Sequence, residues 1–131
     1  MELEQLLSQA VASLDRHKAE DLLALQVSAL TSIADCFLIA SGTSATQVRS
    51  LADYLEDDLR RAGVTPCRSE GYRAGEWITL DYGDLIVHLF RRETRAFYDL
   101  ERLWSDARRW DITPFMMAEN ENLRRDHDDT V

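Results

Sequence analysis

The SGTS tetrapeptide, Ser41 to Ser44, is the first place in this chain where side chains could do chemistry. A serine could act as a nucleophile, and a helix beginning here could bind a phosphate through its backbone N–H groups. The segment lacks the G-x-S-x-G nucleophile elbow and matches neither the P-loop nor G-x-G-x-x-G. Ser44 followed by Gln47 is typical of a capping box. We therefore favour helix capping, and phosphate binding stays open as the alternative.

The titratable residues give little support for catalysis. His17, His88 and His127 lie far apart without metal-ligand spacing, and only His88 falls in a predicted strand. Metal-assisted nucleotidyl transfer needs carboxylates that converge on a cation. Asp99 and Glu101 are two positions apart, so on a helix they do not face each other. We predict no catalytic residue, no metal-binding residue and no cofactor.

The stretch from Trp77 to Trp104 carries the strongest local pattern. Its first half predicts a β-hairpin with Tyr82 and Gly83 as a two-residue turn, so that Asp81 pairs with Asp84. Strand side chains alternate between two faces, and here one face is wholly apolar while the other is mixed. The apolar face contains Ile78, Leu80, Leu85, Val87 and Leu89; the mixed face contains Trp77, Thr79, Asp81, Asp84, Ile86, His88 and Phe90.

The mixed face of this hairpin allows two interpretations. A second helix layer could bury Trp77 and Phe90, and a solvated turn tolerates two aspartates. Alternatively, an aromatic anchor beside carboxylates could bind arginine or lysine side chains of a protein partner. Asp81 opposite Asp84 would be mildly destabilising, and a broken local rule is a hint of function. Both interpretations stay open at this point.

Length and charge narrow the class of protein. The chain has 131 residues, of which 45% are hydrophobic, which fits one domain with a single core. Its net charge of −9 disfavours direct, sequence-specific nucleic-acid binding through a basic surface and suits a basic protein partner. We expect Cys36 and Cys67 to be reduced. The sequence shows neither a signal peptide nor a membrane span, so we expect a cytoplasmic protein without membrane contact.

Periodicity predicts an α/β or α+β domain, with helices packed on one face of a mixed sheet of about five strands. We divide the chain into a domain over residues 1–106 and an acidic C-terminal tail over 107–131 that adds little core. The predicted elements are a helix over 2–16, strands over 22–28 and 36–40, a helix from Ser44 that ends at Gly63, a strand over 64–71, the hairpin, and a helix from Glu93 to about Arg109.

Several specific blocks of the sequence closely resemble the ribosomal silencing factor family, also called Iojap-like. The resemblance covers about residues 3–106 in order. The blocks are KAED (Lys18 to Asp21), D-x-F-x-I-A-S-G-T-S (Asp35 to Ser44), EG (Glu70 and Gly71), W-x-x-L-D-Y-G-D-x-I-V-H-x-F (Trp77 to Phe90) and R-x-F-Y-D-L-E-R-L-W (Arg95 to Trp104).

The resemblance implies a nucleotidyltransferase-like fold without the catalytic carboxylates, found as a homodimer. It implies a protein that binds the large ribosomal subunit through ribosomal protein L-fourteen. By occupying that surface, the protein would keep the small subunit from joining and lower translation when nutrients are scarce. No chemical step is required. An enzyme that uses SGTS for phosphate binding, and a scaffold whose apolar stripes pair two copies, stay as alternatives.

Matching to the family's blocks also places a contact surface for the ribosomal protein. Leu80 conflicts with the hairpin pairing, which puts it on the core face. The predicted contact residues are Glu70, Trp77, Leu80, Asp81, Tyr82, His88, Tyr98, Asp99 and Trp104.

Overall fold

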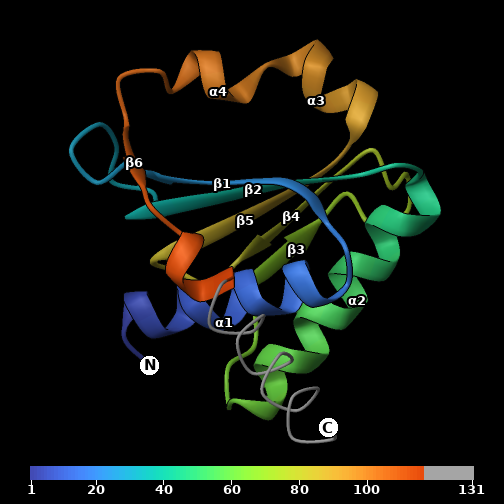
Figure 1. The fold of residues 1–131 in the computed structure, drawn as a ribbon, viewed down its shortest axis with the longest axis horizontal. Helices are drawn as coiled ribbons and strands as arrows, with labels where there is room; N and C mark the ends of the chain where they lie inside the picture. Colours follow the sequence, from blue (N-terminus) through green and yellow to red (C-terminus); the bar gives the residue numbers. More distant parts are fainter. Residues whose placement is uncertain (117–131) are drawn as a thin grey trace, which may run out of the picture.

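A mixed six-stranded sheet forms the centre of the protein in the computed structural model, which describes residues 1–116 (Figure 1). In order across the sheet, the strands are β3 (Arg68–Glu70), β4 (Trp77–Asp81), β5 (Leu85–Arg91), β2 (Cys36–Gly42), β1 (Glu20–Gln26) and β6 (Arg108–Trp110). β2 and β5 pair in parallel, and the other neighbours pair antiparallel. The predicted mixed α/β class is confirmed, with six strands instead of about five.

Helices cover both faces of this sheet. α1 (Leu3–Arg16) and α2 (Ala45–Arg61) lie on one face, while α3 (Arg92–Tyr98) and α4 (Leu100–Leu103) lie on the other (Figure 1). The prediction that helices pack on only one face is therefore wrong. The reason lies in β2, which is buried along its whole length, so its alternate side chains need apolar partners on both sides.

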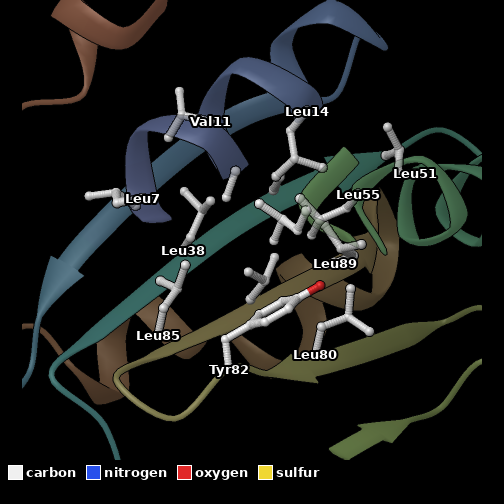
Figure 2. Close-up of a cluster of buried hydrophobic side chains, with 14 of the residues drawn as sticks. Leu7, Val11, Leu14, Leu38, Leu51, Leu55, Leu80, Tyr82, Leu85 and Leu89 are labelled. Carbon is white, nitrogen blue, oxygen red and sulfur yellow. The ribbon is translucent and has the colours of Figure 1, made fainter. Parts of the chain in front are cut away.

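The larger core lies between the sheet and α1 with α2. Figure 2 shows leucines from both helices, β2 and the hairpin converging there, with the Tyr82 ring among them. The five residues predicted for the apolar hairpin face are all 0% exposed, which confirms that face. A smaller core on the opposite side joins β1, β2 and β5 to α4. Its buried residues are Leu25, Val27, Ala34, Phe37, Ile39, Phe90 and Leu100.

The hairpin turn lies one residue later than predicted. The Tyr82 N–H donates to the Leu85 carbonyl at 2.8 Å, so Gly83, with φ of +89°, begins a two-residue turn. Asp81 therefore lies opposite Ile86, and the predicted pairing with Asp84 is wrong. The shift moves every partner by two residues, which keeps each side chain on its predicted face. The expected clash between two aspartates does not arise.

The SGTS segment caps α2, as the sequence favoured. The Ser44 hydroxyl accepts the Gln47 N–H at 3.1 Å, and the Gln47 side-chain carbonyl accepts the hydroxyl of Thr43 at 2.9 Å. Gly63 follows the helix with φ of +90°, the conformation that glycine adopts at helix ends. The strand predicted over 64–71 is present as β3 at the sheet edge, shortened to three residues.

The last predicted helix, Glu93 to about Arg109, is wrong as a single element. α3 ends at Tyr98, Asp99 adopts a left-handed φ of +47°, and only the short α4 follows. The chain must then return across the sheet, where β6 pairs with β1. Ile112 is buried in the larger core, so the segment after residue 107 contributes more than the sequence indicated. Residues 117–131, including His127, lie outside the described part, and the 1–106 and 107–131 division stays a prediction.

Gly71 supplies a test of how β3 meets β4. Its φ is +87°, and a Cβ there would overlap the carbonyl oxygen of Trp77, whereas nothing lies within 4 Å of a Cβ on Gly83 at φ +89°. Both alanine substitutions incur a left-handed strain of about 1 kcal/mol. Gly71→Ala should destabilise the fold by roughly 1–3 kcal/mol more than Gly83→Ala in urea unfolding, because it adds a backbone clash. Equal losses would contradict the close approach.

Candidate partner-binding surface

Trp77 opens β4 on the mixed face, and three neighbours fix its half-buried indole. The ring stacks on Phe90, its partner across the sheet, with ring centroids 4.7 Å apart. The Tyr98 ring from α3 lies 5.1 Å away at a tilted angle. The indole N–H donates to Nδ1 of His88 at 3.1 Å. Trp77 is therefore held rigidly while part of it stays accessible.

His88 supports Trp77 from below and has little surface of its own. It is 7% exposed and lies edge-on to Phe37, with ring centroids 4.8 Å apart. Burial lowers its pKa to about 4, so the ring is neutral at neutral pH. Because Nδ1 accepts from Trp77, the proton belongs on Nε2, which has no hydrogen-bond partner within residues 1–116. His88 therefore fixes the Trp77 ring and offers a partner little surface of its own.

Trp77 and side chains of α3 line a cleft of about 460 Å³. Its polar wall is Arg91, which donates to Glu76 and to Glu93 at 2.8 Å each. The Thr94 hydroxyl, followed by Arg91, holds the pKa of the Glu76 carboxyl below its usual range, so Glu76 stays ionised. The lining residues are Gly71, Ala74, Glu76, Trp77, Arg91, Glu93, Thr94, Phe97 and Tyr98.

The aromatic wall of this cleft continues onto exposed surface. Phe97 is 81% exposed and Tyr98 is 55% exposed, with their rings edge-on at 5.1 Å. Leu103 is also exposed, and it lines a second hollow with Asp99. Large apolar side chains gathered on a surface and rimmed by charge are typical of protein–protein contact sites.

The structure brings four predicted contact residues to this surface. Glu70 and Trp77 line a third hollow of about 260 Å³. Tyr98 and Asp99 line the second hollow, the one that contains Leu103. Asp81 lies further along β4 on the same face and is half-buried.

The other predicted contact residues lie elsewhere. Trp104 is half-buried against Phe37, with ring centroids 5.1 Å apart, and belongs to the smaller core. The prediction that Leu80 and Tyr82 are contact residues is corrected. Both side chains point into the larger core on the opposite side of the sheet, where a partner cannot reach them (Figure 2). Burial also raises the pKa of the Tyr82 phenol.

Sequence reasoning did not include Phe97 among the contact residues. Periodicity placed it on the apolar stripe of one predicted long helix with Leu100 and Leu103. The break at Asp99 leaves Leu100 buried and Phe97 and Leu103 outside. The only signal was an aspartate in the middle of the predicted helix, a residue type that tolerates the left-handed conformation.

Comparison with known proteins decides the family. The family model described as "Ribosomal silencing factor during starvation" matches residues 1–131. The chain belongs to the ribosomal silencing factor family. It is 41% identical over 107 residues to ribosomal silencing factor RsfS of Halalkalibacterium halodurans, covering 82% of this chain and 92% of that protein. RsfS of Bacillus subtilis is 37% identical over 107 residues, covering 82% and 91%.

Solved structures agree with the family. A crystal structure of a Chromobacterium violaceum protein superposes with a TM-score of 0.78 at 37% identity, covering 80% of this chain and 88% of that one. The relatives are named as ribosomal silencing factors, which is a regulatory role. Within residues 1–116 of this family member, no three His, Cys, Asp or Glu residues gather as a metal site would require. No helix in that range is long and apolar enough to cross a membrane.

The buried neutral His88 predicts a pH dependence of stability. Its pKa lies near 4 in the folded protein against an ordinary value of 6.5, so the unfolded chain takes up the proton first as the pH falls. The free energy of unfolding should therefore drop between pH 6.5 and pH 4, by up to roughly 3 kcal/mol from this residue. We expect His88→Gln to lose this part of the drop and His17→Gln to retain it in denaturant titrations. Parallel wild-type and His88→Gln profiles would refute it.

Proposed function

We propose that this chain binds the large ribosomal subunit through ribosomal protein L-fourteen and sterically keeps the small subunit from joining. Translation would then fall when nutrients are scarce. The observation that carries the proposal is the exposed aromatic surface beside Trp77 in a member of this family. The action needs only occupancy of an intersubunit surface, so we infer a binding protein and not an enzyme.

We call the proposed contact region the docking surface and define it by residues that are accessible on one side of the molecule. Its aromatic groups are of the type that dominates binding energy at protein interfaces. Its carboxylates suit arginine and lysine side chains of a basic ribosomal protein. The docking surface consists of Glu70, Trp77, Asp81, Glu93, Phe97, Tyr98 and Asp99.

The overall charge supports the same kind of partner. A chain with a net charge of −9 is repelled by phosphate backbones and attracted to basic proteins. Attraction of this kind raises the rate of encounter more than the final affinity. We further propose that the chain acts in the cytoplasm as a homodimer, which a mass measurement over a range of concentrations would test.

The direct test is co-sedimentation with isolated large and small subunits. The chain should pellet with large subunits alone and, when added first, should reduce the amount of joined ribosomes. Binding to neither subunit, or binding with undiminished joining, would overturn the proposed function.

Tyr98→Ala tests the docking surface with little risk to the fold, because the side chain is 55% exposed. Loss of an aromatic contact residue should weaken large-subunit binding by about thirty-fold, or roughly 2 kcal/mol. The matched control is Tyr54→Ala, since Tyr54 is 48% exposed on α2, across the sheet. Equal affinity of both variants would remove Tyr98 from the surface.

Asp99→Asn tests the charge component. Asparagine tolerates the left-handed conformation of this position, so the backbone should be kept. Removing the charge should reduce the salt dependence of binding, because screened carboxylate contacts weaken as salt is added. Asp57→Asn on α2 is the control and should leave the salt dependence unchanged. An identical salt dependence in wild type and Asp99→Asn would argue against ionic contact at this site.

A further inference from the structure

Arg95 is the one strongly buried arginine side chain among the salt bridges of the described region, at 12% exposure. Its Nη1 group donates to the Ser41 hydroxyl at 2.7 Å and to the Asp21 backbone carbonyl at 2.8 Å. Its Nε group donates to the Glu101 carboxylate at 3.2 Å. The Arg95 guanidinium thus joins β1, β2 and α4 to α3. Arg95 is not itself one of the residues of the docking surface.

The backbone of β1 is irregular where Arg95 binds it. The four residues of β1 from Glu20 to Leu23 lie opposite only three of β2, from Ile39 to Ser41, so β1 carries one extra residue there. Within this bulge Asp21 has a φ of +50°, and its carbonyl turns toward Arg95. Ser41 is 2% exposed and would lack this donor without Arg95. A single side chain therefore binds a backbone carbonyl in the bulge of β1 and a buried hydroxyl of β2.

The arginine also spans the break between the two short helices. The Asp99 N–H donates to the Arg95 carbonyl at 2.8 Å, which ends α3, while the Arg95 side chain binds Glu101 beyond the break. Tyr98 lies within the segment that both bonds close, with its ring 5.1 Å from Trp77. The direction in which Tyr98 faces the cleft, and Asp99 the second hollow, thus depends on a fixed Arg95.

We propose that Arg95 is a positioning residue that sets Tyr98 against Trp77, fixes the backbone turn at Asp99, and so preorganises the docking surface. The rigid guanidinium fork reaches three acceptors at once, which a lysine ammonium on a flexible stem does not reproduce. For its binding partner this inference rests on the proposed function. The geometry of the free chain can be tested without that partner.

Arg92 provides a matched control. It lies three residues earlier in α3 and also ties that helix to β1, through two contacts to Glu20 at 2.6 and 2.7 Å. Its side chain is exposed, and its contacts lie away from the break. An effect common to Arg95→Met and Arg92→Met reflects general loosening of α3, while an effect of Arg95→Met alone reflects the break.

The first measurement uses the free chain with Trp77 as the only remaining tryptophan, through Trp104→Phe and Trp110→Phe. Arg95→Met should make Trp77 fluorescence more accessible to a neutral quencher, because Tyr98 no longer covers the indole. Arg92→Met should not, and Arg95→Lys should fall between them. Unchanged quenching in a folded Arg95→Met chain would overturn the positioning role.

The second measurement is a double-mutant cycle on large-subunit affinity in the otherwise native chain. Arg95→Met should weaken binding about ten-fold, and in the Tyr98→Ala background it should weaken binding less than about two-fold, since both act through one contact. Full additivity would overturn the inference. If quenching responds as expected but the wild-type chain does not bind large subunits, the proposed function fails and the positioning role stands.

Discussion

The parallel pairing of β2 with β5 at the centre of the sheet is the constraint on which the rest of the structure depends. Parallel neighbours need a crossover, and here the chain supplies α2 followed by β3 and β4 between them. Central strands are shielded on both faces, so the structure needs apolar layers above and below. The face toward α1 and α2 is filled by leucines. The opposite face is filled by aromatic rings and by only two short helices.

That imbalance between the two layers explains why accessible aromatic side chains lie at the proposed docking surface. α3 packs on β5 and β2, at the centre of the sheet, and the mixed side of β4 and β3 extends past it. Trp77 lies at this border, covered by Phe90 below and Tyr98 beside it, with its remaining edge accessible. The break at Asp99 shortens this layer, and Phe97, just before it, is exposed.

The sequence was informative wherever periodicity alone decides the outcome. The face assignment of Leu80, Val87 and Leu89 survived an error in the turn, because alternation depends on parity and a two-residue shift preserves it. Ser44 and Gly63 marked α2 because capping is local. The break at Asp99 and the β6 pairing were missed, since both depend on where the chain must return across the sheet. Tertiary pairing of this kind leaves no periodic signal.

Two buried polar side chains, those of His88 and Arg95, lie at positions where hydrophobic packing alone would favour apolar residues. His88 keeps one ring nitrogen without a partner in the described region, and Arg95 holds its charge at 12% exposure. Such groups cost stability unless their hydrogen bonds compensate. Each contacts, or lies beside, an aromatic residue of the docking surface: His88 fixes Trp77, and Arg95 precedes Tyr98 in α3. Rings already fixed before binding lose less side-chain entropy on contact, so the stability lost in folding would strengthen binding at the proposed docking surface.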